Sequence, residues 1–167
     1  MTSWGKVDFS QLEAFQKKLE KLPDEQLQRF ITAVSKELAA RLIQKVQGYT
    51  PVGQYPAGSG KVGGTLRRGW TGKKDMDAFA YAMSLPVVKQ GSGYIIKVIN
   101  PVEYASYVEY GHRQQPGRFV PALGKRLKKG WVEGRFMLTR SEMELESQLP
   151  AIIEKKLQKF LTRAFEK

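Results

Sequence analysis

The chain has 167 residues, of which 41% are hydrophobic, and a formal net charge of +12 at pH 7. A single domain of this length buries roughly 70% of its unfolded surface, so one hydrophobic core is expected. The absence of cysteine excludes disulfides and fits a protein made in a reducing cytosol, and a single histidine disfavours histidine-based metal centres and catalytic triads. These residue types argue against an enzyme and predict neither a metal nor a cofactor, and no apolar run is long enough for a membrane helix.

The first third of the chain is predicted to be helical. Ser10 and Glu13 have the spacing of a helix-capping box, and apolar residues recur at helical intervals after them, so residues 1–23 are expected to form a helical arm without a secretory signal. A second helix is predicted over 24–47, because a proline and two acids precede a long apolar stripe. The stripe consists of Leu27, Phe30, Ile31, Val34, Leu38, Leu42 and Val46.

The stretch 53–64, "GQYPAGSGKVGG", is rich in glycine and is predicted to be a flexible loop. Its "GSGK" is not a phosphate-binding loop, because Tyr55 stands where the first glycine is required and Val62 stands where Ser or Thr is required. Ordering so much glycine costs backbone entropy, on the order of 1–2 kcal/mol per fixed residue. We therefore expect the loop to be mobile in the isolated protein and ordered only at an interface.

Strands are predicted in the middle of the chain, where β-branched residues and alternation are common, at 66–71, 79–86 and 94–99. "KQGSG" is a plausible hairpin connection between the last two. A short helix follows over 104–110 and is closed by Gly111, with Tyr104, Val108 and Tyr110 expected to pack it against the sheet.

The C-terminal part is predicted to begin with a short strand at 136–138. A long amphipathic helix then covers 141–165, opened by a capping box of Ser141 and Glu144 and bent or split by Pro150. This order predicts a single α+β domain over 1–167: N-terminal helices, a small antiparallel sheet with a short inserted helix, and a long C-terminal helix.

The positive charge is concentrated in two segments. Residues 53–74 carry five basic residues and no acid, and residues 111–140 carry eight basic residues against one acid, so the rest of the chain is balanced. Such a pattern favours a polyanion or an acidic protein surface as partner, although the charges can also serve only to keep loops soluble. The basic residues of interest are Lys61, Arg67, Arg68, Arg113, Arg118, Lys125, Arg126, Lys128 and Lys129.

Two interpretations of the region after residue 108 stay open. Glu109 and His112 lie three residues apart, which suits a helix-end ion pair or cap better than acid–base catalysis. In the basic insertion 112–133, Phe119 and Trp131 are interleaved with the basic residues, which is the combination that grips nucleic-acid backbones and stacks on bases. The same two aromatic residues can equally anchor the insertion on a neighbouring subunit.

Four motifs in a fixed order carry a family resemblance: "TPV" at 50–52, "GTLRRGW" at 64–70, "YASYVEYG" at 104–111 and "GRFMLTRS" at 134–141. Over roughly residues 27–165 the chain resembles the tail-completion or head–tail joining proteins of tailed bacteriophages and defective prophages, the gp-ten-like family. Two features depart from the family pattern: the long Gly-rich loop, and the insertion 112–133, whose role the resemblance does not supply.

The resemblance implies a non-catalytic virion protein of the neck or tail end, assembled in the bacterial cytoplasm. Its expected partners are other copies of itself in a ring, with six copies suggested by a six-fold tail, the head-closure proteins, the tail-terminator or tail-tube proteins, and DNA in the lumen. Glu109, His112 and the basic insertion are expected to face a partner, and Phe160 and Phe165 are expected to be exposed interface anchors on the terminal helix. The alternative interpretation is a basic DNA-binding accessory protein.

Overall fold

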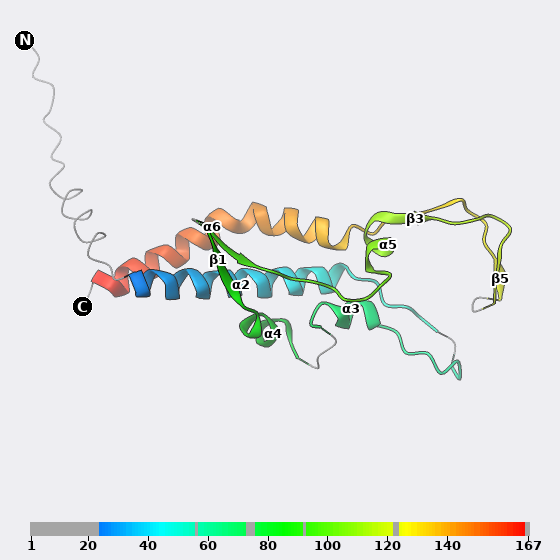
Figure 1. Ribbon diagram of the computed structural model, residues 1–167, viewed down its shortest axis with the longest axis horizontal. Coiled ribbons are helices and arrows are strands. Elements are labelled where there is room, and N and C mark those ends of the chain that lie inside the picture. Colours follow the sequence, from blue (N-terminus) through cyan, green and yellow to red (C-terminus); the bar gives the residue numbers. More distant parts are fainter. Residues whose placement is uncertain (1–23, 56, 73–75, 92, 122–123, 166–167) are drawn as a thin grey trace, which may run out of the picture.

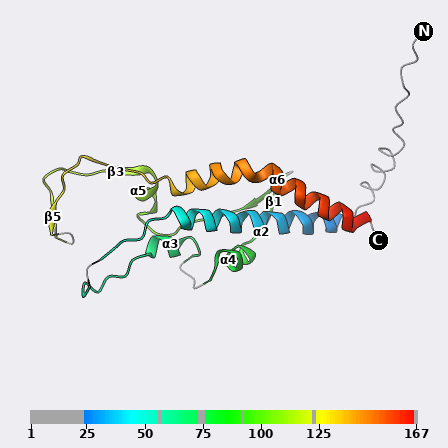
Figure 2. The ribbon, with the colours of Figure 1, turned by 180° about the vertical axis from the view of Figure 1, so that it is seen from behind.

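The computed structural model describes residues 24–55, 57–72, 76–91, 93–121 and 124–165. Two long helices, α2 (Asp24–Tyr49) and α6 (Met137–Phe165), run antiparallel and side by side along an elongated body (Figures 1 and 2). The predicted helix over 24–47 is therefore confirmed and extends by two residues. The predicted helical arm over 1–23, with its capping box, lies outside the described residues.

The hydrophobic core is built on the C-terminal half of α2, where Ala39, Ala40, Ile43 and Val46 are buried. Their spacing of three and four residues places them on one face of the helix, as amphipathic packing requires. This face is rotated from the predicted stripe, because Leu38 and Leu42 are only half-buried. Buried residues from the middle of the chain and from α6 complete the core: Leu66, Trp70, Ala78, Ala82, Val102 and Met137.

Contacts at several levels join α6 to α2. The Phe160 ring stacks on Phe30 with ring centroids 4.5 Å apart, and Lys156 forms an ion pair with Glu37. Nearer the other end, Lys45 Nζ lies 2.5 Å from Glu144 Oε1. The helix is continuous through Pro150 and changes direction midway (Figure 1), so the predicted bend is observed rather than a split.

Two segments predicted as strands are helical. Residues 66–71 fall largely in α3 (Thr65–Gly69), and most of 79–86 falls in α4 (Ala78–Ser84), which packs on α2. In α4 the Asp77 carboxylate accepts a hydrogen bond from the Ala80 amide at 2.8 Å, which makes Asp77 an N-cap, and Ala78 and Ala82 bury one helical face. The apolar pattern of "AFAYAMS" is compatible with both a helix and a strand, and the N-cap at Asp77 favours the helix.

The strands form three separate two-stranded antiparallel sheets instead of one. β1 (Val87–Gln90) pairs with β2 (Gly93–Ile96), with Val87 opposite Ile96. The predicted hairpin connection "KQGSG" is confirmed, but the first strand of the hairpin follows the predicted segment 79–86 and the second ends at Ile96. β3 (Gly111–Arg113) pairs with β6 (Trp131–Glu133), and β4 (Phe119–Val120) pairs with β5 (Lys125–Arg126). The short helix α5 (Ala105–Tyr110) precedes β3, ending at Gly111 as predicted. The α+β fold class is confirmed.

The predicted strand at 136–138 and the capping box at Ser141 are wrong. α6 already begins at Met137, and Ser141 is fully buried inside the helix, where its hydroxyl donates to the Met137 carbonyl at 2.6 Å. A serine hydroxyl that bonds back to the preceding turn is a usual arrangement in the interior of a helix. The N-terminus of α6 is capped from another element, as described below.

Candidate assembly surface

One end of the body is held together by the motifs at 50–52 and 64–70. Thr50 is fully buried just after α2, and its hydroxyl accepts a hydrogen bond from Trp70 Nε1 at 2.9 Å while it donates to the Val46 carbonyl. Arg67 Nη2 donates to the Thr50 carbonyl at 2.9 Å, which fixes α3 to the end of α2. Arg67, predicted to contact a partner, is thus engaged within its own chain.

Glu109 caps the N-terminus of α6. It is only 6% exposed, and its carboxylate accepts hydrogen bonds from Leu138 N at 2.9 Å, Thr139 N at 3.0 Å and Thr139 Oγ1 at 2.9 Å. A carboxylate at a helix N-terminus satisfies free amides and complements the helix dipole. The prediction that Glu109 faces a partner is therefore wrong, because its charge is buried and already engaged.

His112 also lies elsewhere than the sequence suggested. It is in β3 opposite Val132, with its ring 5.6 Å from the Tyr107 ring. The predicted helix-end pair with Glu109 does not form, because the Glu109 carboxylate points to α6. Tyr104 and Tyr110 are exposed instead of packing α5 on a sheet, whereas Val108 does pack against the core.

Gly111 and Gly134, which flank the insertion 112–133, meet at its base. Gly111 has φ +83°, and a Cβ there would lie 2.4 Å from the Val132 carbonyl oxygen. A Cβ on Gly134 would lie 2.2 Å from the Glu109 carbonyl oxygen. Only glycine fits where two backbones approach this closely. The motifs at 104–111 and 134–141 therefore form a crossing from which the insertion leaves the body.

The described residues of 111–135, a segment that includes both glycines, form a narrow antiparallel projection, the basic arm, which extends beyond the ends of the long helices (Figure 1). Backbone hydrogen bonds such as Gln114 N to Gly130 O and Leu127 N to Arg118 O continue the pairing between β3–β6 and β4–β5. The outer part, β4 and β5, stands clear of both long helices (Figures 1 and 2). The basic residues of the whole arm are exposed: Arg113, Arg118, Lys125, Arg126, Lys128, Lys129 and Arg135.

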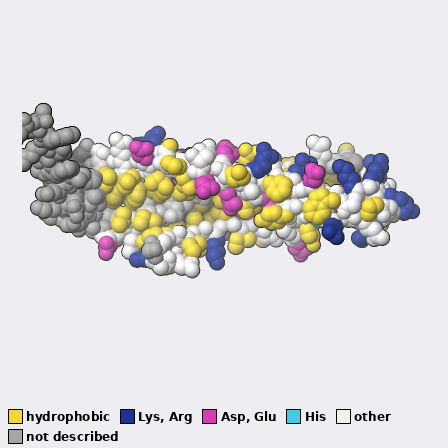
Figure 3. All heavy atoms as spheres, turned by 90° about the horizontal axis from the view of Figure 1, so that it is seen from above, with side chains coloured by type: hydrophobic (Ala, Val, Ile, Leu, Met, Phe, Trp, Pro, Cys, Tyr) yellow, Lys and Arg dark blue, Asp and Glu magenta, His cyan; other side chains and the backbone are white. Residues whose placement is uncertain are grey.

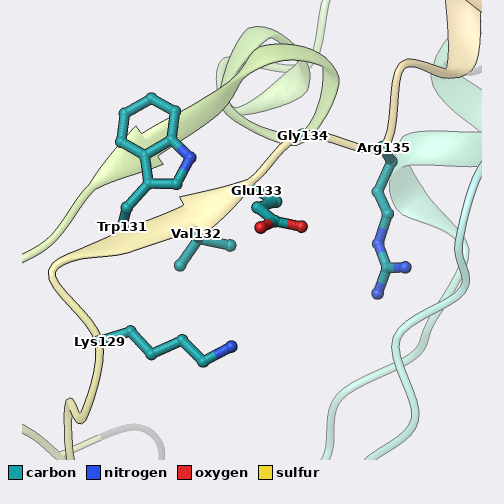
Figure 4. A pocket seen from close by; sticks show the side chains of 6 residues that line it. All are labelled: Lys129, Trp131, Val132, Glu133, Gly134 and Arg135. Atoms are coloured by element: carbon teal, nitrogen blue, oxygen red, sulfur yellow. The ribbon is translucent and has the colours of Figure 1, made fainter.

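The basic arm also exposes aromatic surface. Phe119 is 51% exposed and Trp131 is 48% exposed. Figure 4 shows a hollow at the arm base, of about 440 Å³, where the Glu133 carboxylate lies between the side chains of Lys129 and Arg135. Exposed aromatic and basic groups on one projection are typical of an interface, since aromatics and arginine are enriched where proteins bind one another.

The second basic segment lies at the same end of the molecule. The Gly-rich loop between α2 and α3 projects beside the basic arm (Figure 1), and its described residues from Pro51 to Val62 are exposed. Lys61 lies in this loop, and Arg68 donates to the Gly63 carbonyl at 3.1 Å. Lys and Arg side chains accordingly gather at this end in Figure 3. Two segments that are far apart in the sequence, the loop 53–64 and the arm that begins at Gly111, therefore build one basic end.

The predicted anchors on the terminal helix are placed differently. Phe160 is half-buried against Phe30, so the prediction that it is exposed is wrong, and Phe165 is half-buried as well. The exposed large apolar residues of this helix are instead Met143, Ile153 and Leu157, with Met143 66% exposed.

Sequence reasoning missed an apolar groove along one side of the body. It has a volume of about 410 Å³ and lies between α2, α6 and the segment after β2. Such a volume is comparable with that of pockets that bind ligands, roughly 300–1,000 Å³. The α2–α6 groove is lined chiefly by Leu38, Leu42, Ile99, Leu138, Glu142 and Leu145. Leu38 and Leu42 belong to the predicted apolar stripe, but such a stripe does not distinguish core residues from the lining of an open groove.

Within the described part of the chain, no cluster of three or more His, Asp or Glu side chains is suited to hold a metal ion. Nor does any described helix have the length and apolar character to span a membrane.

Comparison with known families identifies the class of protein. The model of the HK97-gp10-like family, described as "Bacteriophage HK97-gp10, putative tail-component", matches residues 13–111. The match covers more than half of the chain, and the chain belongs to this family of structural components of phage tails. It ends at Gly111, where the basic arm begins, so it is shorter at this end than the resemblance over 27–165. Neither a curated protein nor a solved structure matches the chain significantly.

Proposed function

We propose that this protein completes the head-proximal end of a phage or phage-like tail and joins it to the head, working as a ring of identical copies. Family membership supports a structural role in the tail. The observation that carries the finer assignment is the basic end, where the arm and the Gly-rich loop project together from one end of an elongated body. An end-specific surface of this kind suits a protein that meets different partners along the particle axis.

The proposed partners are neighbouring copies, the head-closure proteins on one side and the tail-terminator or tail-tube proteins on the other. A heterologous contact that closes gives a ring, and a six-fold tail makes six copies the natural number. The basic residues of a ring that encloses a channel would also lie near the DNA that passes through it. The protein would accordingly reside in the neck of the virion and assemble in the bacterial cytoplasm.

The test is loss of the gene in a strain that produces the particle. Electron microscopy of the lysate should show filled heads and finished-length tails that are not joined, and a plasmid copy should restore joined particles. Normal numbers of joined particles without the protein would refute the proposal. Tails that fail to form at all would place the protein in tube assembly instead.

DNA binding is the second candidate, favoured by the exposed basic and aromatic residues of the arm. A protein that contacts six or more phosphates should lose roughly a thousandfold in affinity between about 50 and 200 mM salt. Titration of the purified protein with unrelated duplex DNA measures this slope. A structural neck protein is expected to bind weakly under all these conditions.

A further inference from the structure

We propose that the basic arm of one copy docks onto the α2–α6 groove of the next copy. This inference rests on the proposed function, since it names the contact by which the ring would form. It joins two surfaces that are both exposed in a single chain. The arm offers basic and aromatic side chains, and the groove offers an apolar floor with acids along its α6 edge.

The arm has the properties of a segment that binds another molecule. The Gly111 and Gly134 crossing aims it away from the body, and the continuous backbone pairing keeps it extended. Phe119 and Trp131 each keep about half of their surface in water although apolar burial is favourable, at roughly 25 cal/mol per Å². A projection whose two strands are already paired has less backbone to order when it binds.

The groove has matching properties. Leu38, Leu42 and Leu138 are half-buried along it, and Ile99 is 62% exposed at its edge. The apolar lining remains open because the segment after β2 does not close over α2 and α6. A partner that places an aromatic side chain in such a groove would remove this surface from water.

Charge decides which partner fits. From residue 142 to residue 154, α6 carries four glutamates and no basic residue. Glu142 lines the groove and Glu146 follows one turn later, and both are exposed, whereas Glu144 is paired with Lys45. Lys97 is the basic residue of the lining. The arm carries seven basic residues against the single Glu133, so the arm of another copy is the complementary occupant.

A second copy is also the occupant that geometry favours. The arm stands at one end of the body and the groove lies along its side, so one copy can use both surfaces at once. Such a head-to-tail contact is heterologous, and it generates a ring when the rotation between copies closes.

Charge reversal tests this contact in the full-length protein. The arm variant carries Lys125→Glu and Lys128→Glu, and the groove variant carries Glu142→Lys and Glu146→Lys. All four side chains are exposed, and within the described part of the chain none of them forms a hydrogen bond or an ion pair, so each variant should keep the wild-type circular dichroism. The control matched to the arm variant carries Lys155→Glu and Lys159→Glu, which makes the same change in net charge as the arm variant at the far end of α6.

Sedimentation equilibrium at low salt measures self-association. We expect each of the arm and groove variants to associate at least about tenfold more weakly than wild type, because like charges then face one another. The control variant should associate as wild type does. An equimolar mixture of the arm and groove variants should recover association, because each acid arm meets a basic groove, and each basic arm meets an acid groove. A single chain with all four changes should recover it too.

Failure of both the mixture and the four-fold variant to recover would overturn the inference, as would a wild-type protein that stays monomeric at every concentration. An arm variant that loses DNA binding, with self-association intact, would assign the arm to DNA instead. These outcomes are distinct from failure of the proposed function, which is measured by head–tail joining in the absence of the gene.

Discussion

Replacing Glu109 by alanine should destabilise the protein strongly, although it lies beside a surface expected to meet partners. The change removes an acceptor that receives three hydrogen bonds, from the amides of Leu138 and Thr139 and from the Thr139 hydroxyl. Each polar group that is left unpaired in a part-buried site costs about 1–3 kcal/mol. Loss of a cap alone typically costs about 0.5–2 kcal/mol. Some of the freed groups will find water, so we expect a loss of about 3 kcal/mol in the free energy of unfolding.

Urea unfolding followed by circular dichroism, at a protein concentration low enough for monomer, measures this loss. Glu109→Gln keeps one acceptor oxygen and removes the charge, so it should cost less than alanine, about 1–2 kcal/mol. Glu103→Ala is the matched control, because Glu103 is exposed and precedes the same short helix; its effect should lie within about 0.5 kcal/mol. If Glu109→Ala unfolds at the wild-type midpoint, Glu109 does not cap α6 and its carboxylate is available to a partner.

Three further predictions concern the arm base, the helix pair and the loop. Gly111→Ala should cost at least about 2 kcal/mol more in unfolding free energy than Gly117→Ala, since both glycines have φ +83° but only at Gly111 would the new Cβ meet a backbone atom; equal losses would mean that φ strain alone matters. The hydrogen bond from Lys156, together with Arg41, holds the pKa of Glu37 below its ordinary value of 4.5. The ion pair of Glu37 therefore stabilises the fold fully above the unfolded pKa, and this stabilisation is lost as pH falls below 4.5 and through the lower folded pKa. A urea series at different pH values measures the loss, and Glu37→Gln should flatten this pH dependence. Amides of the Gly-rich loop 53–64 should exchange hydrogen rapidly in the monomer and slowly in assembled particles; strong protection in the monomer would contradict a loop that is ordered by assembly.

Elements with a long, regular apolar pattern were predicted best from the sequence. The helix over 24–47 has apolar residues at helical spacing for several turns, so it could be predicted without knowledge of tertiary contacts. Charge and glycine content also indicated the basic insertion and the Gly-rich loop as exposed segments of the chain. Their meeting at one end of the molecule required the fold.

Short elements, and contacts between residues far apart in the same chain, could not be predicted from the sequence. "AFAYAMS" satisfies both a helical and an alternating pattern, and the hydrogen bond from Ala80 to Asp77 decides between them. Glu109 was assigned to a partner because its real contact, the start of α6, lies 29 residues further along the chain. Leu38 and Leu42 look like core residues in the sequence, and only the path of the segment after β2 leaves them in an open groove.

The most direct test of the central claim is a cryo-electron microscopy reconstruction of the neck of particles that contain this protein. The account predicts a ring of copies at the head-proximal end of the tail, with the arm of each copy lying against the α2–α6 groove of its neighbour. Density for the protein along the whole tail tube, or its absence from the tail end, would contradict the proposed function. A ring at the tail end whose arms point into the channel and contact DNA would keep that function and refute the arm-to-groove contact.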